Sequence, residues 1–284
     1  MTRYLVGIDG SLRGKRAADW AACQVGRAGG VMTLLTVVDP VGAAGLGFDS
    51  ETFSRAAQES LDDVVEYLSV KYPGLIVSTK VVVGTLIESM VDEAADYDVL
   101  VVGSHHGFGA GRTFGNATGL KLSVSSPIPT VVVPNDWRPE NAGVGITVGV
   151  GPDDSAAKAI AFGVERSLVT GESLELVSGW GLPAFLSKPA ELMGGGISPV
   201  GDQFQNTLDK IVAELKETNP DLDVTGKAEE STSPARAILE ASRHSSMLVL
   251  GTHSYGTFGR ALFGSTTASV LSNLLVPTVV VPMK

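Results

Sequence analysis

The stretch Leu100-Val101-Val102-Gly103-Ser104-His105 returns later in the chain as Leu248-Val249-Leu250-Gly251-Thr252-His253. At the same offset of 148 residues, Pro129-Thr130-Val131-Val132-Val133-Pro134 returns as Pro277-Thr278-Val279-Val280-Val281-Pro282. Between residues 100 and 134 this ungapped shift gives thirteen identities in thirty-five positions. The chain is therefore one fold written twice, and each copy carries a strand that ends in a Gly-rich loop.

The bulk composition agrees with two globular domains. The chain has 284 residues, of which 44% are hydrophobic and 18% are charged, as in ordinary folded proteins. Each copy spans roughly 140 residues, which is enough to bury a core without disulfides or metals. We expect a first domain at residues 1–138 and a second at residues 143–284, joined through the linker Asn135 to Gly143.

Charge and cysteine content exclude several classes of protein. The net charge of −10 is shared evenly, since residues 1–140 hold 11 basic and 16 acidic residues and the remainder holds 10 and 15. No basic half, tail or patch exists, so we expect neither nucleic acid nor an anionic membrane as a partner. The single cysteine, Cys23, excludes an internal disulfide and a cysteine metal cluster. The N-terminal residues have no signal-peptide layout, and we expect a cytoplasmic protein.

Strand patterns alternate with helical patterns in both copies. The expected strands of the first copy are Tyr4–Asp9, Met32–Val38, Leu75–Val83, Val99–Val102 and Thr130–Val133. Those of the second are Gly145–Val150, Leu174–Ser178, Leu222–Gly226, Met247–Leu250 and Thr278–Val281. Such alternation predicts right-handed crossovers and an open parallel α/β sheet in each copy. The long segment from Trp180 to Asp202 is expected to be a loop, either a lid or binding loop or a disordered, covering segment.

The strand ends predict a ligand cleft. In an open parallel sheet, ligands bind beyond the carboxyl ends of the strands, where the winding reverses. Asp9 ends the first strand and Gly103 ends the fourth, so both lie at one cleft if these strands are neighbours. Glycines let backbone N–H groups approach an anion, and the helix start that follows offers further N–H groups. Taken alone, the glycine spacing also fits loops that only make turns.

Three features together resemble the universal stress protein family. They are the opening strand that ends in Val6-Gly7-Ile8-Asp9-Gly10-Ser11, the arrangement Gly-x-x-Gly, nine residues, then Gly-Ser/Thr after a Val-rich strand, and the closing Pro-Thr-Val-Val-Val-Pro. The resemblance covers both copies nearly end to end, and the chain is similar to the tandem members. It implies two open parallel five-stranded sheets of the universal stress protein (adenine nucleotide alpha hydrolase-like) type, with strand order 3-2-1-4-5. It further implies ATP bound by the opening Asp and the Gly-rich loop, and pairing of the two domains through their last strands, Val131–Val133 and Val279–Val281.

The first copy keeps the nucleoside end of the family pattern. Asp9 stands where the family has its base- and ribose-side Asp, and Gly103 starts the loop. His106 replaces the second Gly, and Asn116 stands at the third, with Gly115 one residue early. The candidate binding residues of this copy are Asp9, Gly103, Ser104, His105, Gly107, Asn116 and Thr118.

The second copy keeps the phosphate end. Gly251, Gly264 and Ser265 match the family, but Ser254 replaces the second Gly, and the opening strand ends in Gly151-Pro152 where an Asp is expected. The candidate binding residues of this copy are Gly251, Thr252, His253, Gly256, Gly264, Ser265 and Thr266. Each copy therefore keeps a different half of the pattern.

Three functions are left open by the sequence. The resemblance favours an ATP-binding regulatory or stress-response protein without strong catalysis, in which Mg or Mn arrives with the triphosphate. A slow ATPase or nucleotidyl-type transferase would need a base beside the terminal phosphate, and only the repeated His105 and His253 qualify. A nucleotide-free interaction module with decayed clefts is the third. We expect no metal site and no catalytic residue in the protein itself, and a homodimer is also left open.

Overall fold

The structure is a computed structural model that describes residues 1–41, 49–104, 117–151, 156–181, 198–252 and 264–283. The chain divides into two compact units, Met1–Asn141 and Ala142–Met283. None of the helices in the described ranges combines the length and the apolar character that crossing a membrane requires.

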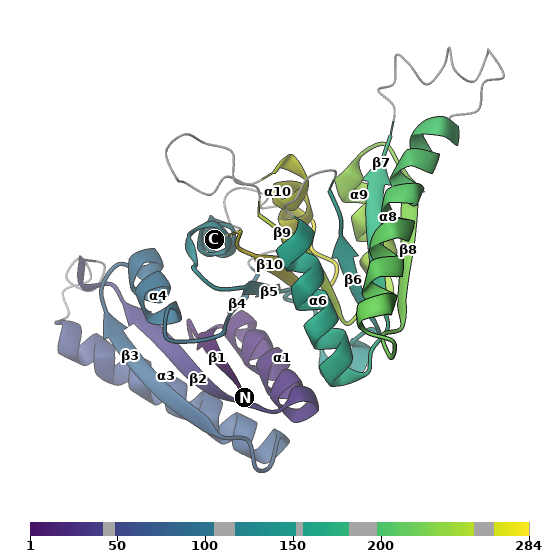
Figure 1. The fold of residues 1–284 in the computed structure, drawn as a ribbon. Coiled ribbons are helices and arrows are strands. Elements are labelled where there is room, and N and C mark those ends of the chain that lie inside the picture. The colour runs from purple at the N-terminus through teal and green to yellow at the C-terminus, as the bar shows by residue number, and fades with distance from the viewer. Residues whose placement is uncertain (42–48, 105–116, 152–155, 182–197, 253–263, 284) are drawn as a thin grey trace. The chain divides into compact units, whose positions relative to one another are not determined.

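The first domain is a parallel sheet covered by helices on both faces (Figure 1). Its elements are β1 (Thr2–Gly7), α1 (Leu12–Ala28), β2 (Gly30–Val38), α3 (Ser50–Lys71), β3 (Val77–Val83), α4 (Leu86–Ala94), β4 (Val99–Gly103), α5 (Ala117–Ser125), β5 (Thr130–Val133) and the short 3-10 helix η1 (Pro139–Asn141). The strands lie in the order β3-β2-β1-β4-β5. The predicted α/β fold with parallel sheets is confirmed. β1 and β4 are neighbours, so Asp9 and Gly103 end adjacent strands.

Small side chains let α1 lie close to this sheet. Ala17, Ala18, Ala21 and Ala22 are fully or almost fully buried, and they form the helix face that packs on β1 and β4. The helix begins at Ser11, whose hydroxyl accepts a hydrogen bond from the Gly14 amide (3.4 Å), as an N-cap does. A close helix of this kind brings the first turn of α1 to the carboxyl ends of the strands.

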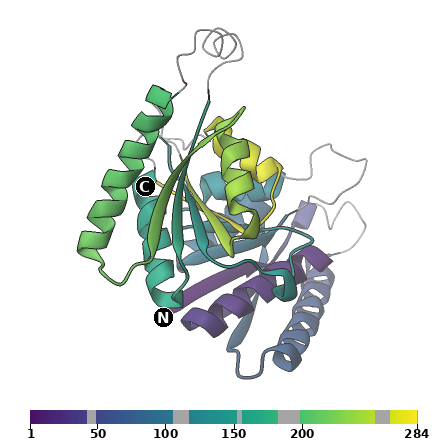
Figure 2. The same cartoon turned by 90° about the vertical axis from the view of Figure 1, so that its right-hand side faces the viewer.

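The second domain repeats the architecture, with α8 on one face of its sheet and α9 and α10 on the other (Figure 2). Its elements are β6 (Ile146–Gly149), α6 (Ala156–Thr170), β7 (Leu174–Trp180), α8 (Ser198–Thr218), β8 (Val224–Glu230), α9 (Pro234–Ala241), the 3-10 helix η2 (Ser242–His244), β9 (Met247–Gly251), α10 (Ser265–Ser272) and β10 (Thr278–Val281). The strands lie in the order β8-β7-β6-β9-β10.

Two predicted boundaries in this domain are wrong. The third strand runs from Val224 to Glu230 and not from Leu222 to Gly226, because it pairs with β7 along its whole length, up to Trp180 opposite Glu230. The predicted loop Trp180–Asp202 is also too long. β7 includes Trp180 and α8 already begins at Ser198, while residues 182–197 lie outside the described residues.

Backbone hydrogen bonds fix which residues of the two domains are equivalent. The Ile8 amide donates to the Leu35 carbonyl, and the Val150 amide donates to the Val177 carbonyl, both at 2.8 Å. The strand ends therefore superimpose one to one. Asp9, which follows β1, is equivalent to Gly151, and Asp39, which follows β2, is equivalent to Gly181.

A glutamine in the long helix binds the third strand of each sheet. In the second domain, the Gln205 amide nitrogen donates to the Gly226 carbonyl (3.0 Å), and its oxygen accepts from the Ala228 amide (2.9 Å). In the first domain, the Gln58 amide nitrogen donates to the Thr79 hydroxyl (3.0 Å). This contact is a second, structural sign of the duplication.

Candidate functional site

The first domain has a cleft of about 740 Å³ at the carboxyl ends of β1, β2 and β4. The volume falls in the range of roughly 300–1,000 Å³ that is usual for small-molecule sites. Asp9, Gly103 and Thr118, three of the predicted binding residues, all line it. The structure therefore brings the end of the opening strand, the start of the Gly-rich loop and the helix after that loop to one place.

The Asp9 carboxylate is held in a fixed orientation. Its Oδ1 atom accepts hydrogen bonds from the Ser11 amide (3.1 Å) and from the Ser11 hydroxyl. Gly14 comes close from the first turn of α1, since a Cβ there would lie 3.2 Å from the same Oδ1. Among the described residues, Oδ2 has no hydrogen-bond partner. The side chain thus presents one oriented acceptor atom to a ligand.

Gly103 is required by packing as well as by its place in the cleft. A Cβ at this position would lie 2.5 Å from the carbonyl oxygen of Arg13, a backbone atom that cannot move aside on its own. Only glycine lets the end of β4 touch the first turn of α1 in this way. The glycine therefore explains how Asp9 and the loop start come together, whatever the ligand is.

Of the remaining predicted residues of the first copy, only Ser104 is among the described residues, and it does not line the cleft. Ser104 is buried, and its amide continues the ladder with β5 by donating to the Val133 carbonyl (2.8 Å). It is not among the residues that line the cleft. His105, Gly107 and Asn116 lie outside the described residues.

One wall of the first cleft is apolar, and none of its residues is among the predicted binding residues. Phe53, Ala56 and Ala57 come from the N-terminal half of α3, and Leu86 and Met90 come from α4. These helices follow β2 and β3, so their first turns lie above the carboxyl ends of the sheet. Their distance along the chain from Asp9 left no local signal, and only the strand order could have indicated them.

The second domain has a smaller cleft of about 270 Å³ at the corresponding strand ends. Gly151 and Gly181 line it where the first cleft has Asp9 and Asp39. Trp180, Phe204 and Ile238 are also among the described lining residues, and none of these described residues is charged. Trp180 is almost buried, and a Cβ at Gly201 of α8 would lie 2.6 Å from its ring. The indole thus occupies space next to the strand ends.

Some of the predicted binding residues of the second copy line this cleft, and others do not. Gly251 and Thr266 line the cleft, and the unpredicted Thr267 donates from its hydroxyl to the Gly251 carbonyl (3.3 Å). Thr252 is buried, and its hydroxyl accepts from the Met283 amide (3.1 Å), so it does not face the cleft. The first turn of α10 follows Gly264, which is its N-cap and makes no side-chain cap bond.

Ser265 is the exposed first residue of α10, and neither it nor Gly264 is among the described cleft residues. His253 and Gly256 lie outside the described residues.

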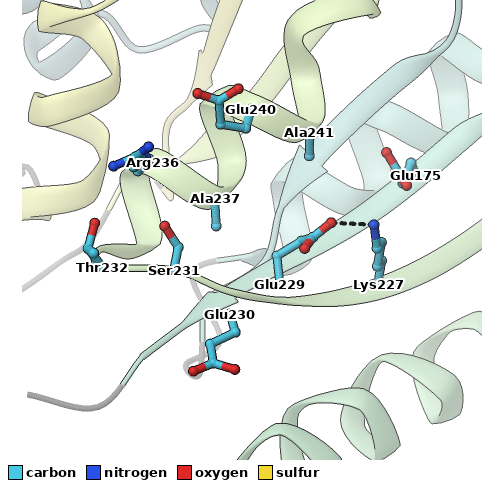
Figure 3. Close-up of a pocket in the computed structure, with 10 residues that line it drawn as sticks. All are labelled: Glu175, Lys227, Glu229, Glu230, Ser231, Thr232, Arg236, Ala237, Glu240 and Ala241. Atoms are coloured by element: carbon cyan, nitrogen blue, oxygen red, sulfur yellow. Dashed lines mark ion pairs between the residues drawn. The ribbon is translucent and has the colours of Figure 1, made fainter. Parts of the chain in front are cut away.

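A third hollow lies between α9 and the outer strands of the second domain (Figure 3). Its charges are mixed, and two of its charged residues form an ion pair with each other. Lys227 forms an ion pair with Glu229, and that hydrogen bond raises the pKa of Lys227, while Glu240 pairs with Arg243 at 2.9 Å. Within the described ranges, no group of three or more residues is arranged to hold a metal ion. We assign no ligand to this hollow.

Known proteins agree with this architecture. The model of the Universal stress protein family matches residues 1–134 and again residues 145–282. A universal stress protein of Mycobacterium tuberculosis strain H37Rv is 27% identical, with 97% of this chain and 95% of that protein covered. One of Mycolicibacterium smegmatis is 24% identical, with 98% and 96% covered.

Solved structures show the same fold over the full length. The crystal structure of a universal stress protein from Archaeoglobus fulgidus has a TM-score of 0.73 at 16% identity, and covers 99% of this chain and 98% of its own. A functionally unknown protein from Pseudomonas aeruginosa has a TM-score of 0.65 at 16% identity, with 99% and 92% covered. With both halves matched by the family model, the chain belongs to the universal stress protein family as a tandem member.

Proposed function

We propose that the first cleft binds an adenine nucleotide such as ATP, and that the protein acts as a nucleotide-binding regulatory or stress-response protein without strong catalysis. The observation that carries the proposal is the Asp9 carboxylate, which lines the cleft, is held by Ser11 through one oxygen and has no partner for its second oxygen among the described residues. A ribose hydroxyl or an adenine amino group can donate to that oxygen. The apolar wall of α3 and α4 offers a surface for the flat base.

The second cleft supports weaker binding or none. Gly151 removes the carboxylate that Asp9 supplies, and Trp180 and Phe204 line a cleft of about 270 Å³. A hydrogen bond to a charged group contributes about 1.5–3 kcal/mol, which corresponds to roughly a ten- to hundredfold difference in affinity. We therefore expect one high-affinity site per chain, and the nucleotide-free interaction module remains the alternative for this half.

The first cleft also determines what we expect for metal-ion binding and for catalysis. We expect Mg²⁺ or Mn²⁺ to enter with the triphosphate, bound mainly by its oxygens, because the described residues offer no three-ligand group. A slow ATPase is the alternative, and it needs a base beside the terminal phosphate. Hydrolysis of ATP by the purified protein, measured with and without Mg²⁺, decides between the two.

We also propose that the two domains pair through β5 and β10. The support is the family resemblance of both closing strands, Val131–Val133 and Val279–Val281, together with the need to cover two exposed sheet edges. Cysteines placed at Val132 and Val280 in a Cys23→Ser background are expected to cross-link within one chain. Cross-links only between chains would indicate a homodimer instead.

The nucleotide proposal is tested in two steps. The purified protein is denatured, and the released supernatant is assayed for adenine nucleotides. ATP binding is then measured by calorimetry for the wild type and for Asp9→Asn, which we expect to bind roughly ten- to a hundredfold more weakly. Asp136→Asn is the matched control, because Asp136 is exposed and does not line the cleft. A clean supernatant with no binding heat, or wild-type affinity in Asp9→Asn, would overturn the proposal.

A further inference from the structure

Arg13 is a cation in the first cleft that is not among the residues predicted from the sequence. It lies in the first turn of α1, is half-buried and lines the cleft with Asp9 and Gly103. Its Nε–H donates to the Ser11 hydroxyl (3.4 Å), and that hydroxyl donates to Asp9. Among the described residues, the terminal nitrogens of the guanidinium have no hydrogen-bond or ion-pair partner. Arg16, one turn further on, differs because it is paired with the buried Asp19 at 3.3 Å.

The position of Arg13 connects the two ends of the cleft. Its backbone packs directly on Gly103, since a Cβ built there would lie 2.5 Å from the Arg13 carbonyl oxygen and 2.9 Å from its Cβ. Its guanidinium reaches back to Ser11, which holds Asp9. The side chain therefore spans from the start of the Gly-rich loop to the carboxylate that we assign to the nucleoside.

The charges around Arg13 indicate what it does. The other charged residues among the described lining of this cleft are Asp9 and Asp39. Asp39 already accepts a hydrogen bond from the Val41 amide (2.9 Å) through Oδ1. Two carboxylates alone would repel a phosphate, so a cationic side chain here favours a phosphorylated ligand. The five N–H donors of a guanidinium match phosphate oxygens in a planar fork.

We propose that Arg13 binds a phosphate group of the nucleotide and makes the first cleft prefer phosphorylated adenine ligands to adenosine. This inference rests on the proposed function, because it assigns one end of the same site. It also predicts a difference in ligand binding between the two domains. At the position equivalent to Arg13 the sequence of the second copy has Ser155, which lacks a charge and lies outside the described residues.

The test compares ligands that differ only in phosphate. Calorimetry measures adenosine, AMP and ATP against the wild type, Arg13→Gln and Arg13→Lys. We expect Arg13→Gln to lose roughly ten- to a hundredfold in affinity for AMP and ATP while binding adenosine as the wild type does. Arg13→Lys keeps the positive charge but lacks the planar guanidinium, so it should recover part of the lost affinity for AMP and ATP. The wild-type preference for AMP over adenosine should shrink as salt is raised.

Other results of these binding measurements would contradict the role proposed for Arg13. Equal losses for adenosine and ATP in Arg13→Gln, with an unchanged circular dichroism spectrum, would mean that Arg13 only positions Asp9. Unchanged binding of all three ligands would remove Arg13 from the site. A wild type that binds none of them would overturn the proposed function itself and this inference with it. Arg55→Gln is the matched control, since Arg55 is an exposed arginine of α3 that does not line the cleft.

Discussion

Asp9 and Gly151 occupy equivalent positions after the first strand of each domain, yet only the first offers a carboxylate. The same holds deeper in the fold, where Asp19 of α1 is fully buried and its equivalent in α6, Ala161, is exposed. The two halves of the chain carry almost the same number of charges, so the difference is one of placement. Duplication preserved the backbone register, while charges were retained or lost site by site. Function therefore has to be assigned separately to each domain.

The largest of these differences is the network around Asp19. Its carboxylate accepts hydrogen bonds from the Tyr67 hydroxyl (2.9 Å), the Lys71 amine (3.0 Å) and the Tyr72 hydroxyl (3.2 Å). Burial raises the pKa of Tyr72 far above its ordinary value. Burial alone would lower the pKa of Lys71, but its hydrogen bonds to Tyr67 and Asp19 outweigh that effect and raise it. The network fastens α1 to the end of α3.

Replacing Asp19 by Leu is expected to have the largest effect on stability. The change leaves Arg16 and Lys71 without their carboxylate. Because the Lys71 side chain is 31% exposed, we expect a cost near the lower end of the range for a broken buried pair, about 3 kcal/mol. Urea unfolding should show this loss in the first domain when it is followed by the fluorescence of Trp20 of α1 in a Trp137→Phe, Trp180→Phe background, because the chain has three tryptophans. Ala161→Leu, at the exposed equivalent position, should stay within about 0.5 kcal/mol. Equal stability of the two variants would contradict the role given to Asp19.

Gly103→Ala should have an intermediate effect. The added Cβ forces the first turn of α1 away from β4, and overpacking of this kind typically costs about 1–3 kcal/mol. Nucleotide affinity should fall as well, because Asp9 and Arg13 move with that turn. Gly26→Ala is the control, since Gly26 is exposed in the same helix and its added Cβ would meet no atom within 4 Å beyond the nearby helix backbone. If Gly103→Ala lowered the nucleotide affinity but left the free energy of unfolding at the wild-type value, Gly103 would be needed for ligand binding and not for packing.

The smallest effect concerns pH. In the first domain, Arg3 pairs with Asp98 at 3.0 Å, and the hydrogen bond from Arg3 lowers the pKa of Asp98. At the equivalent place in the second domain, the buried Ser246 hydroxyl donates to the Gly145 carbonyl (2.9 Å), which does not titrate.

The sign of the pH effect follows from that lowered pKa. A carboxyl whose pKa is lower in the folded state stabilises the fold above its unfolded pKa of about 3.9, and this contribution is lost as the pH falls through the folded value. On acidification from pH 5 to about pH 3, the urea midpoint of the first domain should therefore fall slightly more in the wild type than in Asp98→Ser. Identical acid profiles for the two proteins would show that the ion pair contributes nothing.

The sequence predicted the parts of the fold and site that are local. The repeat placed Gly103, Thr118, Gly251 and Thr266, all of which line their clefts. Ser104 and Thr252 stand next to two of these glycines but still pair with the closing strands, and this could not be read from loop composition. The cleft walls come from helices that follow other strands, so Phe53 and Trp180 required the strand order.

Gln205 has a consequence for self-association. In the described part of the chain β8 pairs with β7 alone, which leaves its other backbone groups available to a foreign strand. The Gln205 amide already engages the Gly226 carbonyl and the Ala228 amide, much as an incoming strand would. One side chain of the same domain thereby occupies two of the backbone groups that an edge-to-edge partner would need.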